Sequence, residues 1–190
     1  INLTQLIYSL SKFRTPGYYA FDLYRESLAL CTDKVDLSPA QFANILHAIC
    51  PNRDLLIPEE QEVLSFIVSS GPLFVDQLSS QLLSSVAESS AWLGLTDLLV
   101  LVASRVGKQP LGRDLVTTLC ALSHAKLLVE SMVFSLSITD AIDTPQLCRL
   151  LVAIRFSNLP VSLEFAEGVC SRLRDTCEEM TREEMEELLS

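Results

Sequence analysis

Two histidines and two cysteines are the residues of this sequence best suited to metal chemistry. His47 and Cys50 are three residues apart, and Cys120 and His124 are four apart, so each pair can share one helix face. Together they would supply two imidazoles and two thiolates, a set that binds zinc. A whole repeat of the kind described below separates the two pairs, and packed helices are roughly 8–10 Å apart. We therefore expect ordinary packing here, with no metal and no cofactor.

Motifs for covalent or phosphate chemistry are weak. A nucleophile–histidine–acid triad would need His47 or His124, and neither lies near an elbow of the GxSxG type. The segment 107–112 contains glycine and lysine in the wrong order for a phosphate-binding loop. We expect no catalytic residue and a protein that is not an enzyme.

Five cations are the candidates for contact with RNA phosphates, and they surround one turn and flank a later helix: Arg105, Lys108, Arg113, Arg149 and Arg155. They would touch phosphate if stacked helices aligned them along one ridge, and they also fit solvated loops and helix ends. The whole chain has 14 Lys and Arg against 24 Asp and Glu, a net charge of −10. This balance argues against a strongly electrostatic nucleic-acid surface, because neutralising phosphates needs clustered cations.

Charge is uneven along the chain. Residues 37–104 hold one cation and seven acids, whereas residues 105–169 hold six of each. If RNA binds, the later part is therefore the better candidate, and the earlier acidic part should face protein.

Aromatic residues are the candidates for partner binding. Trp92 falls in an expected loop, 89–96, where it would be an exposed interface anchor or be buried under the next repeat. Tyr18 and Tyr19 belong to a cluster with Phe21 and Tyr24 that one helix cannot bury on a single side. One or two of these rings should face a partner or a preceding repeat.

The elements that must position these residues are helices. Apolar residues recur at helical spacing throughout, and strict two-residue alternation is hard to find. Ser38-Pro39-Ala40-Gln41 is a capping box, Thr144-Pro145 repeats the cap-then-proline pattern, and Pro58 precedes two acids. The expected helices are 2–12, 17–31, 39–50, 59–70, 73–88, 96–106, 113–124, 126–138, 145–156, 161–178 and 182–190.

Cysteine usage and hydropathy indicate the cellular setting. The six cysteines contain no CxxC pair and lie in apolar helical stretches, as free thiols in a reduced compartment do. The longest clean apolar run is 98–103, far short of the ~20 residues that span a bilayer. We expect an intracellular segment without a membrane partner.

A five-residue box recurs along the chain, with two apolar-leaning residues, a variable residue, a small residue and an apolar residue. It occupies 6–10, 45–49, 82–86, 118–122 and 150–154, and Leu188-Leu189 would open a sixth copy. The second box positions are 39, 37, 36, 32 and 38 residues apart, a period typical of helix-pair repeats.

The repeat predicts an all-α fold, an α-solenoid of stacked helix pairs, because one pair cannot bury its own apolar face. The expected repeats are 1–37, 38–74, 75–112, 113–143 and 144–180, with 181–190 opening a sixth, all within a single segment. The sequence begins at Ile1 inside an apolar pattern, so we expect it to be part of a longer protein.

Two stretches resemble a known class of repeats. SPAQFANILHAI and TPQLCRLLVAIRFSNLPVSLEFAEGVCSRL…MTREEMEELL are similar to the degenerate helical repeats of organellar RNA-metabolism proteins, the octotricopeptide-like and FAST-kinase/RAP-type repeats of kinetoplastid and apicomplexan mitochondria. The resemblance covers most of the chain and is best in the second and fifth repeats. It implies RNA binding or scaffolding in RNA-processing and ribosomal assemblies, and a mitochondrial matrix location. It supplies no site residues.

Together these observations favour a non-enzymatic scaffold that makes protein–protein contacts within a larger complex, with RNA in an indirect role. One alternative is direct binding of single-stranded RNA by the solenoid. Another is a non-repeat helical domain that acts in tethering or trafficking.

Overall fold

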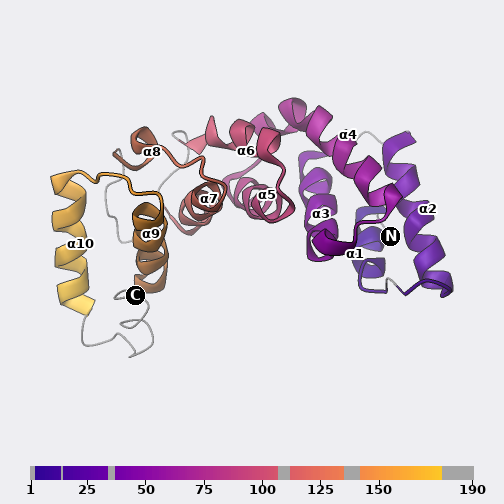
Figure 1. Cartoon of the computed structure of the whole chain (residues 1–190), viewed down its shortest axis with the longest axis horizontal. Coiled ribbons are helices and arrows are strands. Elements are labelled where there is room, and N and C mark those ends of the chain that lie inside the picture. The colour runs from indigo at the N-terminus through magenta and orange to yellow at the C-terminus, as the bar shows by residue number, and fades with distance from the viewer. Residues whose placement is uncertain (1–2, 14, 34–36, 107–111, 135–141, 177–190) are drawn as a thin grey trace. The chain divides into compact units, whose positions relative to one another are not determined.

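The chain is all-α in the computed structural model, which describes residues 3–13, 15–33, 37–106, 112–134 and 142–176 (Figure 1). The described residues form ten α-helices, two short 3₁₀ helices and no strand. The α-helices are α1 (Leu3–Leu10), α2 (Tyr19–Asp33), α3 (Pro39–Ile49), α4 (Pro58–Phe74), α5 (Ser80–Leu93), α6 (Thr96–Ala103), α7 (Arg113–His124), α8 (Glu130–Phe134), α9 (Thr144–Phe156) and α10 (Leu163–Thr176). The 3₁₀ helices are η1 (Cys50–Leu55) and η2 (Val75–Gln77).

The helices divide into two compact units, Ile1–Val102 and Ala103–Ser190. In the N-terminal unit, α3 packs against both α1 and α5, while α2 packs against α1 and α4. In the C-terminal unit, α9 lies between α7 and α10 (Figure 1). The five copies of the sequence box fall on α1, α3, α5, α7 and α9, which we call the box helices. Within each unit, consecutive box helices therefore contact one another.

The box residues form the core as their pattern predicts. The second position is 0–1% exposed in four of the five copies, at Ile7, Leu46, Leu83 and Leu119. The fifth position is buried in all copies but the first. The variable third position is exposed in α1, α3 and α9. The same five residues therefore contribute both to the core and to the surface.

Two predicted helix starts are confirmed. Ser38 Oγ accepts a hydrogen bond from the Gln41 amide at 3.3 Å, and Gln41 Oε1 accepts one from the Ser38 amide at 2.9 Å. Helix α4 begins at Pro58, and Glu60 in its first turn caps the Ile57 amide at 2.9 Å. The predicted cap at Thr144 is wrong by one residue, because the Asp143 carboxylate accepts from the Gln146 amide and Thr144 is already helical.

The predicted break between helices 59–70 and 73–88 is also wrong. Helix α4 continues through Pro72 to Phe74, and the next helix begins only after Ser79, whose Oγ accepts from the Leu82 amide at 3.3 Å. Helix α6 packs closely against α4 at Gly71, where a Cβ atom would lie 2.8 Å from Leu98 Cδ1. Ser79, which caps α5, therefore marks the start of this helix, whereas Pro72 does not mark the end of α4.

Three box helices end in the same way. Gly94, Lys126 and Asn158 follow α5, α7 and α9 with φ values of 73°, 59° and 52°, in the left-handed region. The next residue in each case donates its amide to a carbonyl five residues back, as in a Schellman motif. This geometry corrects two predictions. The stretch 89–96 is mainly the last turn of α5 rather than a loop. The helix expected over 126–138 is, in its described part 126–134, a turn followed by α8.

The other predicted helices are confirmed to within a few residues at their described ends. The expected helix 182–190, and with it the start of a sixth repeat, lies outside the described residues.

Candidate functional site

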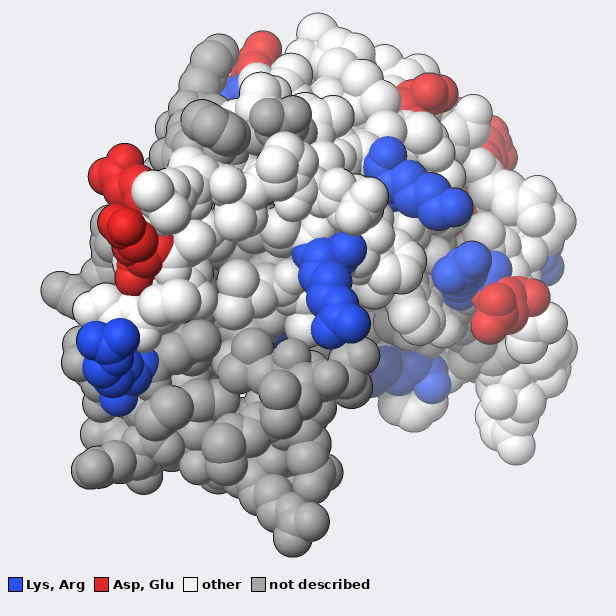
Figure 2. Space-filling model, turned by 60° about the vertical axis from the view of Figure 1, so that its left-hand side comes forward, with Lys and Arg blue, Asp and Glu red and all other residues white. Residues whose placement is uncertain are grey.

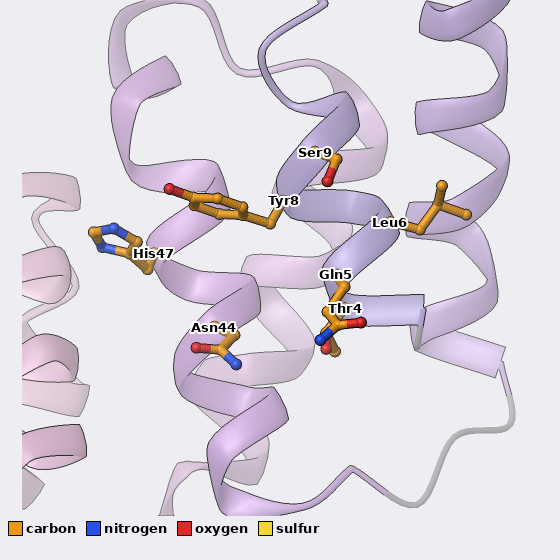
Figure 3. Close-up of a pocket in the computed structure, with 7 residues that line it drawn as sticks. All are labelled: Thr4, Gln5, Leu6, Tyr8, Ser9, Asn44 and His47. Carbon is orange, nitrogen blue, oxygen red and sulfur yellow. The ribbon is translucent and has the colours of Figure 1, made fainter. Parts of the chain in front are cut away.

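A hollow in the N-terminal unit lies between α1 and α3 and has a volume of about 740 Å³ (Figure 3). Seven residues line it: Thr4, Gln5, Leu6, Tyr8, Ser9, Asn44 and His47. Its side chains come from two consecutive box helices, which position them. The hollow is partly open to solvent, which suits a docked ligand better than an enclosed substrate.

Aromatic rings and amide groups dominate this hollow. The Tyr8 ring extends from α1 toward His47 on α3, with ring centroids 6.2 Å apart and planes 14° apart (Figure 3). Lys12 Nζ lies 4.9 Å from the centroid of the Tyr8 ring. Gln5 and Asn44 lie one helical turn before the two rings and point into the same hollow. Such groups bind by stacking and by hydrogen bonding to amide or base edges.

A second hollow lies between α7 and α9 in the C-terminal unit, with a volume of about 180 Å³. It is lined by Cys120, Ser123, His124, Cys148, Arg149, Val152, Ala153 and Phe156. The His124 and Phe156 rings have centroids 6.3 Å apart and planes 44° apart. Cys120 and Cys148 are buried cysteines that line it.

The two hollows occupy equivalent places in the repeat. The third box position contributes Tyr8 and His47 to the first hollow, and Cys120 and Val152 to the second. The position three residues before the third box position contributes Gln5 and Asn44 to the first hollow and Arg149 to the second. Each unit therefore presents the same face of its box helices.

The predicted partner-binding aromatics lie outside both hollows. Tyr18 and Tyr19 are 66% and 81% exposed at the start of α2, whereas Tyr24 of the same cluster is fully buried. Trp92 is 57% exposed in the last turn of α5, and the Arg53 guanidinium lies 5.7 Å from its ring centroid. The prediction that one helix cannot bury the whole tyrosine cluster is confirmed.

The predicted RNA-binding cations belong to three separate elements where they are described. Arg149 and Arg155 are six residues apart on α9, which places them about 120° apart around the helix. Arg113 is exposed at the start of α7, Arg105 is half-buried in the turn after α6, and Lys108 lies outside the described residues. On the face drawn in Figure 2, the blue side chains stand apart from one another.

The potential zinc ligands are divided between the units. His47 is exposed on α3, and Cys50 follows at the start of η1, where burial raises the pKa of its thiol. Cys120 and His124 line the second hollow. Among the residues that the structure describes, no group of three or more His, Cys, Asp or Glu side chains is arranged to hold a metal ion.

Sequence reasoning did not select Gln5, Tyr8, Asn44 or Phe156. The sequence contains a pattern that indicates these residues, because the box separates buried positions from a variable third position on the same helix. A search for exposed residues at that position, and at those three before and four after it, would have found all four.

Comparison of the chain with protein-family models, with curated proteins and with solved structures gives no match. In the described part of the chain, none of the helices combines the length and apolar character needed to cross a bilayer.

Proposed function

We propose that this chain is a non-enzymatic α-solenoid segment that binds partner proteins along the exposed face of its box helices. Contacts between successive box helices within each unit, α1–α3–α5 and α7–α9, support the solenoid architecture. The buried second and fifth box positions support it further, because in a solenoid each repeat covers the apolar face of its neighbour.

The observation that carries the proposal is the set of apolar and aromatic side chains exposed on this face. Tyr8 is 43% exposed on α1, and Val152 and Phe156 are 47% and 66% exposed one turn apart on α9. Single exposed apolar residues are common, but adjacent ones that line a hollow mark interaction sites. Large aromatic side chains in such positions supply much of the binding energy in protein interfaces.

The setting of the proposed scaffold follows from the resemblance to organellar helical repeats. It is a multisubunit assembly that processes RNA or is associated with ribosomes, in the mitochondrial matrix. The net charge of −10 fits a partner that is protein rather than bare RNA.

Direct binding of single-stranded RNA is the second candidate, and one observation favours it. The stacked Tyr8 and His47 rings lie beside the Gln5 and Asn44 amides, and Lys12 is close to them. Proteins recognise unstacked bases with aromatic faces and hydrogen-bonding side chains of this kind.

Affinity purification of the protein from native extract, with and without RNase, tests the proposal. We expect a defined set of proteins that survives RNase, and we expect the double variant Tyr8→Ser, Phe156→Ser to lose it. Leu73→Ser is the matched control, because Leu73 is 69% exposed on α4, which is not a box helix. Circular dichroism verifies that the variants fold.

Loss of the whole set on RNase treatment would make RNA the ligand and favour the second candidate. Equal loss in the Leu73→Ser control would show that the box-helix face is not the binding surface.

A further inference from the structure

The second hollow continues into a neighbouring one at the ends of α7 and α9. The neighbouring hollow has a volume of about 430 Å³ and is lined by Ser123, Lys126, Leu128, Phe156 and Ser157. Ser123 and Phe156 line both hollows, so the two are adjacent, and we call them together the α7/α9 groove.

The floor of the α7/α9 groove is held together by short contacts. Ser123 Oγ donates to the Ala153 carbonyl at 2.9 Å and lies 2.8 Å from Ser157 Oγ. Cys120 Sγ donates to the Arg149 carbonyl at 3.6 Å. These small side chains let α7 and α9 approach closely along the groove.

The charge of the groove is opposite to that of the chain. Arg149 and Lys126 line it from two sides, and none of the described residues that line it is acidic. Within the described part of the chain, neither cation makes an ion pair, in contrast to Arg25, which pairs with Glu59. Two unpaired cations flanking one groove in a protein of net charge −10 give it a local preference for anions.

Between the cations the groove is apolar. The exposed sides of Val152 and Phe156 form one wall, and the buried Leu128 side chain lies beyond the shared Phe156. An occupant that fits this arrangement carries an apolar side chain for the wall and anionic groups on either side.

We propose that the α7/α9 groove binds an acidic, apolar-centred peptide segment of a partner protein. Its apolar side chain packs on Val152 and Phe156, and its carboxylates contact Arg149 and Lys126. An RNA strand fits less well, because it presents a phosphate at every nucleotide and needs a longer track of cations than these two. The assignment rests on the proposed scaffold function and names the chemistry of its partner.

Two pools of synthetic peptides test this assignment on the full chain. Each peptide of about eight residues has two central apolar positions (Leu, Ile, Phe or Met), flanked by Asp or Glu in one pool and by Lys or Arg in the other. We expect the immobilised protein to retain the acidic pool at least about tenfold more than the basic pool at physiological salt. An oligouridine strand is tested alongside.

Three variants locate the binding. Arg149→Glu and Phe156→Ser should each abolish the preference for the acidic pool, because both residues line the groove. Arg113→Glu is the matched control, since it makes the same charge change on an exposed residue at the opposite end of α7. It should leave retention unchanged. Unfolding midpoints establish that each variant is folded.

Equal retention of the two pools overturns the proposal, as does acidic-pool binding that survives Arg149→Glu and Phe156→Ser. Binding of oligouridine, lost in Arg149→Glu, with no retention of the acidic pool assigns the groove to RNA and also overturns it. The purification from extract reports on the scaffold function separately. A surviving set of partner proteins without peptide binding refutes only this inference, and peptide binding without any partner set refutes only the scaffold function.

Discussion

Two adjacent acids at the start of α4 have contrasting environments. Glu59 is partly exposed and accepts two hydrogen bonds from the Arg25 guanidinium on α2. Glu60 is fully buried, where its carboxylate accepts from the Tyr24 hydroxyl at 2.7 Å as well as from the Ile57 amide. The sequence predicts acids in the first turn of a helix, because they complement the helix dipole. It does not predict their partners on α2, which are 34 and 36 residues away.

The pair of Arg25 and Glu59 makes stability depend on pH. Hydrogen bonding from Arg25 lowers the pKa of Glu59 below its ordinary value of 4.5. The stability that the pair adds is therefore present above pH 4.5 and is lost as the pH falls through the lowered pKa. We expect Glu59→Gln to flatten the fall in the free energy of unfolding below pH 4.5, measured by urea titration over a pH series. Glu62→Gln, an exposed carboxylate on the same helix, is the control. The same flattening in both variants would show that Arg25 is not the cause.

The cysteines should differ sharply in reactivity. Cys31 is 1% exposed, and burial raises the pKa of its thiol to about 11, whereas Cys170 is exposed on α10. Because the thiolate is the reactive species, we expect iodoacetamide at neutral pH to modify Cys170 in the native protein and Cys31 only after unfolding. Mass spectrometry of tryptic peptides separates Cys170 from Cys177, since Arg172 lies between them. Equal rates for Cys31 and Cys170 in the native protein would contradict the burial of Cys31.

At the level of the elements, helix ends were harder to predict than helix faces. The apolar spacing of the box identified every box helix, and Ser38 marked the start of α3 correctly. Pro72 marked a false break, because α4 continues through it to Phe74, with Leu98 of α6 close to Gly71. Lys126 follows α7 with a positive φ, which a lysine in the sequence does not indicate. The sequence therefore predicted a helix that continues through this residue.

Lys126 offers a direct test of the shared helix ending. Its φ of 59° is unfavourable for a residue with a Cβ atom and costs glycine nothing. We expect Lys126→Gly to raise the free energy of unfolding by about 1 kcal/mol, measured by urea denaturation. Asn158→Gly, at the equivalent position after α9, should raise the free energy of unfolding by less, because asparagine tolerates this conformation. Destabilisation by Lys126→Gly would show that α7 does not end in the Schellman motif.

At the level of the whole molecule, the sequence predicted the helical class, and the stacking of helix pairs into a solenoid stays a prediction. The division into two compact units was not predicted, because local periodicity is the same on both sides of residue 102. Which helices contact one another depends on packing across tens of residues, and no pattern in the sequence reports it directly. The candidate hollows were missed for the same reason, since each combines residues from two helices.

The two units should respond separately to damage in their cores. Leu46 and Leu119 occupy the second box position of α3 and α7, and both are fully buried. Leu46→Ala and Leu119→Ala should each cost about 2–5 kcal/mol of stability in their own unit. Hydrogen exchange followed by mass spectrometry should show faster exchange in residues 1–102 for the first variant and in residues 103–190 for the second. Equal acceleration throughout the chain in both variants would show that the units unfold as one.

The positions of the five-residue box have different roles, and this difference affects how such a protein can evolve. The second and fifth positions hold the helices together, while the third faces outward in α1, α3 and α9. Tyrosine, histidine and valine occupy that outward position in these helices, so side chains of very different chemistry are compatible with the same packing. Substitutions there can change what the surface recognises without weakening the fold. A chain built in this way can keep its architecture while its binding preferences drift from one lineage to the next.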